Sequence, residues 1–299
     1  MGATPLAVRA RRGPRTNWLA AAFFLGPTVA AFIAFSYLPL GRAVYMSLHN
    51  YNWMKPPGPF VGLSNYVKSF RSLSFRTDLA NSAILFLFSL ALGFWVPVLQ
   101  ALLLDQIARA AQRVMKYLYL LPMAIPAVAS FLVWKWIWNP SLGLANAVLG
   151  LVHIPPQLWL GDPRLVKLTL RLPYLLGGGM NVMIILAAIQ GVSPELHEAA
   201  EIDGAGAWQR MWHITVPGIW HIVTILFILT LTGALLAFDD VFVMTGGGPG
   251  TASTTIVYGI YLVAFRQQNP GQGSAWAVLV LVLTLIITGI QLRLRREES

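Results

Sequence analysis

Residues 193–217 read SPELHEAAEIDGAGAWQRMWHITVP, a polar stretch between long apolar runs in the second half of the chain. Ser193 is a favoured residue type for a helix N-cap, and Pro194 suits the first helical position. The pair Asp203-Gly204 is a turn or C-cap signal. The stretch therefore predicts a helix of about two to three turns, a tight bend at Gly204 and a second short helix around residues 208–212. Its four carboxylates lie within nine positions: Glu195, Glu198, Glu201 and Asp203.

The composition excludes an ordinary soluble domain. Of the 299 residues, 57% are hydrophobic and 11% are charged, whereas soluble domains average about 25% charged residues. A chain of this length holds about six membrane helices of about 20 residues each, with their loops. It has no cysteine and so no disulfide or thiolate metal site, and we expect no metal. The net charge of +10 fits basic residues that flank membrane spans, and we expect no nucleic-acid partner.

The apolar runs predict an all-α polytopic membrane protein with both termini on one side. The basic segment 1–17 and the basic tail 294–299 favour the cytoplasm for that side. Residues 18–78 then hold the first span and an extracytoplasmic loop, and residues 193–217 lie in the cytoplasm between spans 4 and 5. The six expected spans are residues 18–40, 79–104, 117–138, 169–191, 216–245 and 274–292.

Polar residues inside these runs are candidates for a translocation path, because in lipid they should face a bundle interior or a water-filled cavity. Asn181 lies in the fourth span, and Asp239 and Asp240 lie in the fifth. Trp134 near the end of the third span suits either an interfacial aromatic belt or a ring that stacks on a sugar. The Pro and Gly residues of spans 3, 4 and 5 likewise suit ordinary membrane helices or broken helices that line a path.

Two enzymatic motifs are incomplete. The run HEAAE at residues 197–201 begins like the zinc motif HExxH but ends on Glu201 instead of histidine. The run GGGPGT at residues 246–251 lacks the lysine of a Walker phosphate loop, and no lysine follows Lys167. We therefore expect a transport component without an ATPase site of its own. An ion-coupled secondary transporter and a membrane-embedded enzyme are the alternatives.

The spacing within residues 198–217 resembles a family signature. EAA, three residues, Gly, nine residues, Ile, one residue, Val and Pro match the EAA loop of membrane subunits of binding-protein-dependent ABC importers, in which leucine usually stands at Val216. FVGLSNY at 60–66 and MTGGGP at 244–249 resemble the carbohydrate-uptake branch, the MalF/UgpA-like permeases. The resemblance covers about residues 18–293, with the permease domain at about 79–293.

This resemblance implies a coupling helix that seats in an ATP-hydrolysing subunit. The implied partners are a second homologous permease, two ATP-binding subunits that hold ATP and Mg, and an extracytoplasmic substrate-binding protein. The implied location is the lipid bilayer of a prokaryotic cell membrane, and we expect no cofactor in this chain. The expected cargo is a di- or oligosaccharide or a polyol, with glycerol-3-phosphate or a glycerophosphodiester as the alternative. The coupling role carries over to Glu198, Ala199, Ala200, Asp203, Gly204, Ile214 and Pro217.

Overall fold

The structure is a computed structural model that describes residues 18–54, 56 and 58–297. The basic segment 1–17 lies outside these residues. The described residues form helices and no strand. Up to six membrane spans result if the bent pairs Arg109–Ala124 with Ala127–Ile137 and Gly179–Gln190 with Pro194–Ile202 each count as one span, and four spans are single long helices. These four are Ala22–Ser47, Leu73–Asp105, Ala207–Leu235 and Pro270–Gln291.

The helices follow one another with short connections in most of the chain. The α-helices are α1 (Trp18–Phe32), α2 (Leu38–Ser47), α3 (Ser64–Arg71), α4 (Leu73–Leu90), α5 (Val96–Asp105), α6 (Arg109–Leu120), α7 (Ala127–Ile137), α8 (Leu144–Leu151), α9 (Val166–Arg171), α10 (Tyr174–Gly177), α11 (Gly179–Gln190), α12 (Pro194–Ile202), α13 (Ala207–Arg210), α14 (Val216–Leu235), α15 (Ile256–Tyr261) and α16 (Pro270–Glu297). Wider π-helical turns lie at Ile33–Tyr37, Ala91–Trp95, Met211–Thr215, Val241–Thr245 and Leu262–Arg266.

Three of the π-helical turns end two residues before a proline. Pro39, Pro97 and Pro217 occupy the first turns of α2, α5 and α14, two residues after the end of the π-helical turn. A proline has no backbone N–H, and its ring clashes with the carbonyl four residues earlier. In each case that carbonyl lies inside the π-helical turn. The long helices therefore continue through their prolines because one turn widens.

Helices α5, α11 and α14 form the largest apolar core, since each contributes residues at helical spacing. A second core joins α4, α9 and residues 241–258 around Leu85, Leu170 and Tyr258. A third core lies around the buried Trp276 of α16. Helix α2 packs on α16, but no residue between 22 and 46 is buried. This first span therefore offers its surface to lipid or to another chain.

The third and fourth predicted spans are not single helices. Pro122 and Pro126 separate α6 from α7, and the two parts bend by 103°. A single helix over residues 169–191 is wrong, because Pro173 and Gly178 divide it into α9, α10 and α11. Helix α11 has 12 residues and is about 18 Å long, too short for a hydrocarbon core of about 30 Å.

The structure confirms a helix after Pro194 and corrects two boundaries beyond it. No separate helix surrounds residues 208–212, because α13, the following π-helical turn and α14 are one continuous helix. The fifth span ends at Leu235 instead of residue 245. At this break the Thr255 hydroxyl donates a 3.0 Å hydrogen bond to the Ala237 carbonyl, and the Asp240 carboxylate accepts one from the Val241 N–H. The break is thus stabilised by side chains.

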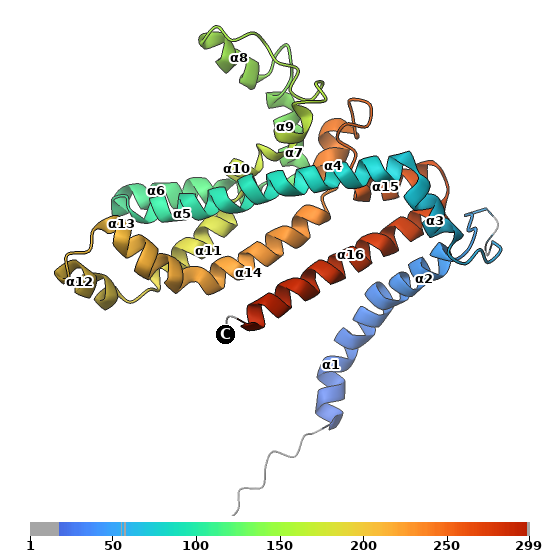
Figure 1. Ribbon diagram of the computed structural model, residues 1–299, viewed down its shortest axis with the longest axis horizontal. Coiled ribbons are helices and arrows are strands. Elements are labelled where there is room, and N and C mark those ends of the chain that lie inside the picture. Colours follow the sequence, from blue (N-terminus) through green and yellow to red (C-terminus); the bar gives the residue numbers. More distant parts are fainter. Residues whose placement is uncertain (1–17, 55, 57, 298–299) are drawn as a thin grey trace, which may run out of the picture.

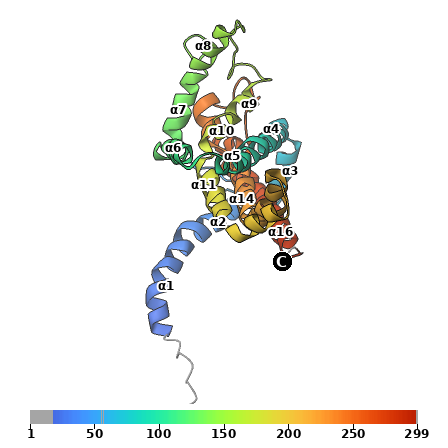
Figure 2. The ribbon, with the colours of Figure 1, turned by 90° about the vertical axis from the view of Figure 1, so that its left-hand side faces the viewer.

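Helices α4 with α5, α14 and α16 lie side by side along the long axis of the molecule (Figure 1). Helices α12 and α13 lie at one end of that axis, and the C-terminal end of α16 points toward the same end (Figure 1). Helix α8 stands away from the bundle beyond α7, and α1 leans away from it on the other side, in both views (Figures 1 and 2). The fold therefore has a compact centre and two projecting parts.

Candidate functional site

Helix α12 ends in a hydrogen-bonded turn that fixes its direction. The Ala205 N–H donates to the Ala200 carbonyl at 2.9 Å, and the Gly204 N–H donates to the Glu201 carbonyl at 3.0 Å. This is the Schellman pattern, with Gly204 in the left-handed region at φ +83°. The tight bend at Gly204 is therefore confirmed. Ser193 occupies the N-cap position, but its hydroxyl donates to the Glu195 carboxylate at 3.1 Å and does not cap the backbone.

Most of the α12 surface is free in the described chain. Glu198, Ala199 and Asp203 are exposed, and Ala200 is half-buried. The Ile202 side chain is 87% exposed and that of Leu196 is 55% exposed. Small residues beside exposed aliphatic ones allow another surface to approach the helix backbone closely and to bury apolar area.

Two polar contacts connect α12 to the helix that follows the bend. The Nε2 atom of His197 lies 3.1 Å from the Thr215 hydroxyl, and the Arg210 guanidinium lies 2.6 Å from the Glu201 carboxylate. Ile214 is half-buried in the π-helical turn at Met211–Thr215, and Pro217 is exposed in the first turn of α14. The contacts therefore join α12 to the start of the fifth span.

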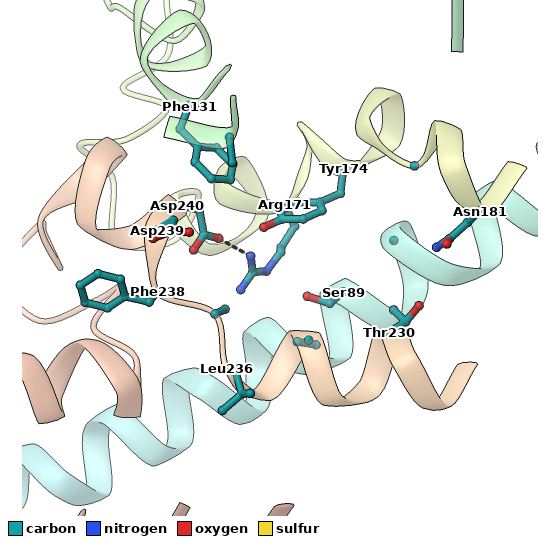
Figure 3. Close-up of a pocket in the computed structure, with 16 residues that line it drawn as sticks. Ser89, Phe131, Arg171, Tyr174, Asn181, Thr230, Leu236, Phe238, Asp239 and Asp240 are labelled. Carbon is teal, nitrogen blue, oxygen red and sulfur yellow. Dashed lines mark hydrogen bonds and ion pairs between the residues drawn. The ribbon is translucent and has the colours of Figure 1, made fainter. Parts of the chain in front are cut away.

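A cavity of about 450 Å³ lies among the broken elements of the bundle, and its mainly apolar lining includes several polar side chains. Such a volume falls within the range of about 300–1,000 Å³ that is usual for small-molecule sites. Helices α4, α7, α9, α10, α11 and α14 contribute to its walls, together with the segment that follows the break at Leu235. Figure 3 shows Phe131 and Tyr174 on one side of the cavity and Ser89 and Thr230 on the other. The cavity therefore combines aromatic rings with hydroxyl and charged groups.

A buried ion pair between Arg171 and Asp240 forms part of the cavity wall. The Arg171 Nη1 atom donates to the Asp240 Oδ2 atom, and each side chain is 1% exposed (Figure 3). The guanidinium carbon also lies 5.3 Å from the centre of the Tyr174 ring. Removing one partner of such a pair leaves an uncompensated buried charge and costs about 3–5 kcal/mol. The pair therefore holds α9 against the segment after the fifth span.

The cavity brings together three of the four predicted path residues. Asn181, Asp239 and Asp240 line it, although both aspartates lie after the end of α14 and not inside a membrane helix. Trp134 lines a neighbouring cavity of about 410 Å³ and stacks on Trp138, with 5.5 Å between the ring centres. Trp134 is thus separate from the other three.

Arg171 is the charged cavity residue that was not predicted from the sequence. It lies inside the apolar run that predicts the fourth span, where an arginine is costly unless it has a partner. That position is the signal that points to it. A search for a carboxylate to compensate it leads to Asp239 and Asp240, which are nearly the only carboxylates within the predicted spans.

A bundle of membrane helices around a cavity with polar groups in its wall, together with an exposed helix tied to one span, defines a membrane transport component. The profile of the family described as binding-protein-dependent transport system inner membrane component matches residues 93–297. The chain belongs to this family, and it is a multi-pass protein of the prokaryotic plasma membrane. Members of the family are transport components and not enzymes.

Two relatives cover nearly the whole chain. A probable ABC transporter permease, YurN of Bacillus subtilis, is 32% identical over 90% of this chain and 94% of its own length. The trehalose/maltose transport system permease MalF of Thermococcus litoralis is 31% identical over 90% of this chain and 91% of its own length. These similarities support the resemblance to carbohydrate-uptake permeases.

Solved structures of a bacterial alginate ABC transporter have the same fold. One, of the importer of the acidic polysaccharide alginate, superposes with a TM-score of 0.83 at 25% identity and covers 94% of this chain and 96% of the other. Another includes a periplasmic protein bound to an alginate pentasaccharide, and its TM-score is 0.84 at 25% identity with 94% of each chain covered. A substrate-binding protein is thus a partner of that relative.

Proposed function

We propose that this chain is the permease subunit of an ATP-driven importer and that it forms a carbohydrate path together with a second, homologous permease. The observation that carries the proposal is the exposed α12, which ends in a fixed turn and is tied to the fifth span. Two ATP-binding subunits bind on the cytoplasmic side, hold ATP and Mg, and contact α12. An extracytoplasmic substrate-binding protein delivers the cargo from the other side.

The coupling role of α12 follows from its exposure and from its two connections. Glu198, Ala199 and Ala200 form the face on which an ATP-binding subunit seats, and Asp203 with Gly204 fixes the direction of the chain beyond it. When two ATP-binding subunits close on ATP, they move α12. The contacts of His197 and Glu201 pass the displacement to the fifth span, at the level of Ile214 and Pro217.

The proposed topology has six spans with both termini in the cytoplasm. The permease domain is residues 79–293, preceded by the basic segment 1–17 and the part at 18–78 and followed by the tail 294–299. The bent pair of α6 and α7 counts as one crossing. Helices α9, α10 and α11 together form the fourth crossing, and α12 lies outside the membrane on the cytoplasmic side. In this arrangement α8 lies on the extracytoplasmic side, where a binding protein docks.

We assign the cargo to carbohydrates, on a path that includes Asn181, Asp239 and Asp240. Two observations support this class. The cavity joins hydroxyl and charged groups with aromatic rings, which suit the two faces of a sugar. Of the proteins named above, MalF is a trehalose/maltose transport permease and the solved structures are of an importer of alginate. Glycerol-3-phosphate or a glycerophosphodiester is the second candidate cargo. Its negative charge distinguishes it from an uncharged carbohydrate.

The test is uptake by vesicles that contain the complete transporter. With ATP inside and a loaded binding protein outside, a carbohydrate should accumulate, and Gly204→Pro should abolish its uptake while the ATP-binding subunits remain expressed. Normal uptake by Gly204→Pro would refute the coupling role. Uptake by this chain alone, with an ion gradient and no ATP, would identify a secondary transporter instead, and turnover by the purified chain would identify an enzyme.

A further inference from the structure

Two nitrogen atoms of the Arg171 guanidinium have no hydrogen-bond partner in the described structure. Its Nη1 atom donates to Asp240, but its Nε and Nη2 atoms are buried and form no hydrogen bond. Buried donors normally have a partner, because an unsatisfied donor retains its full desolvation cost. Arg171 lines the cavity, and in Figure 3 part of its guanidinium extends away from Asp240 into the space between Leu236 and Ser89. These two groups are therefore placed to donate to a molecule in the cavity.

The charges around the cavity limit the kind of molecule that it can bind. Asp240 already compensates Arg171, and its second oxygen accepts the hydrogen bond from the Val241 N–H. Asp239 is exposed to the cavity and forms no ion pair with the described residues. The charged lining residues thus sum to one negative charge, from Arg171, Asp239 and Asp240. This net negative charge repels an anionic cargo.

The remaining polar groups suit hydroxyls that both donate and accept. The Ser89 and Thr230 hydroxyls donate to carbonyls of their own helices, at 2.8 Å each, so their oxygens are left as acceptors. Asn181 offers both an amide donor and a carbonyl acceptor. A sugar hydroxyl can accept from Arg171 and donate to Asp239, whereas a fully ionised phosphate or carboxylate group has no proton for Asp239.

We propose that Arg171 is the specificity-determining residue of this cavity: fixed by Asp240, it donates from Nε and Nη2 to hydroxyl oxygens of an uncharged carbohydrate, and Asp239 excludes anionic analogues. The proposal rests on the proposed function. Membership of the family does not decide whether the cargo is charged, since the alginate importer takes an acidic polysaccharide.

The test measures how many cargo molecules enter vesicles per ATP hydrolysed. The complete transporter with its binding protein is offered trehalose, maltose, glycerol-3-phosphate and an alginate oligosaccharide. We expect the wild type to import an uncharged sugar and neither acidic probe. Arg171→Lys keeps a cation beside Asp240 but loses the fixed pair of donors, so import per ATP should fall at least about tenfold, the equivalent of about one hydrogen bond.

A charge-swapped variant, Arg171→Asp with Asp240→Arg, separates specificity from structure. It restores the ion pair but moves the guanidinium to the other element, so import per ATP should stay at least about tenfold low. Wild-type import per ATP in either variant would overturn the proposal. Import of an acidic probe by the wild type would also overturn it, while leaving the chain a permease with the second candidate cargo. If no probe enters although the binding protein stimulates ATP hydrolysis, the carbohydrate assignment and this inference both fail.

Discussion

His197 and Thr215 join the exposed helix α12 to the span that follows it, through a hydrogen bond of 3.1 Å between His197 Nε2 and the Thr215 hydroxyl. Thr215 is 7% exposed and closes the π-helical turn before Pro217. The bond therefore links an exposed surface to the interior of the bundle, and it crosses the bend at Gly204.

We expect His197→Ala to uncouple transport from ATP hydrolysis. The variant loses the bond to Thr215, worth about 1 kcal/mol, and the longer 3.4 Å contact of Nδ1 with the Ser193 carbonyl. The fold should persist, while cargo moved per ATP falls several-fold. The measurement is uptake and phosphate release in vesicles with the complete transporter. His213→Ala is the matched control, because the Nδ1 atom of His213 contacts only the carbonyl of Gln209 in its own helix, at 2.9 Å. An equal amount of cargo moved per ATP in the two variants would contradict a coupling role for His197.

Gly204→Ala should destabilise the bend, since an alanine in the left-handed region costs about 1–2 kcal/mol. The cost is confined to the backbone, because a Cβ at Gly204 would meet no atom within 4 Å. Gly206→Ala is the control: Gly206 has φ −68°, and its Cβ would lie 3.7 Å from the Gln209 side chain. Uptake and thermal unfolding of both variants check this. A Gly206→Ala protein as impaired as Gly204→Ala would mean that the positive φ is not the cause.

Ile202→Asp should weaken binding of the ATP-binding subunits at least about tenfold. The side chain is 87% exposed on the proposed docking face, and central aliphatic anchors of interfaces become costly when they are replaced by charge. Co-purification at increasing salt, or titration with the isolated subunit, measures the effect. Leu142→Asp makes the same kind of change at an 81% exposed position before α8, and it should leave this affinity intact. Equal losses at the two sites would refute docking on α12.

Gly179→Ala should destabilise the packing of α11 against the end of α6. A Cβ at Gly179 would lie 1.9 Å from the Tyr119 carbonyl oxygen, a backbone atom that cannot rotate away. Overpacking of this kind costs about 1–3 kcal/mol. Thermal unfolding of the purified transporter measures it. Gly289→Ala in α16, where a Cβ meets no atom within 4 Å, is the control and should leave the unfolding temperature unchanged. An unchanged unfolding temperature in Gly179→Ala would show that α6 and α11 can separate.

Local residue types account for α12 and for the position of its bend. Ser193, Pro194 and Gly204 act on their own neighbours, so their structural effect does not depend on the rest of the chain. The same holds for the prolines. Pro122, Pro126 and Pro173 mark breaks in the helices, because a missing N–H and a ring clash are local properties. Whether a proline breaks a helix or only widens one turn, as at Pro217, was decided by packing.

The sequence by itself determined the class of the protein: its apolar runs require membrane spans, and the EAA loop identifies the family. The tertiary structure alone decided which polar residues meet. Arg171 and Asp240 are 69 positions apart, and no local rule pairs them. Their contact arises because α9 breaks away from α11 and the fifth span ends at Leu235, which places both side chains in one cavity. A buried charge requires a partner, but only the packing of the helices selects it.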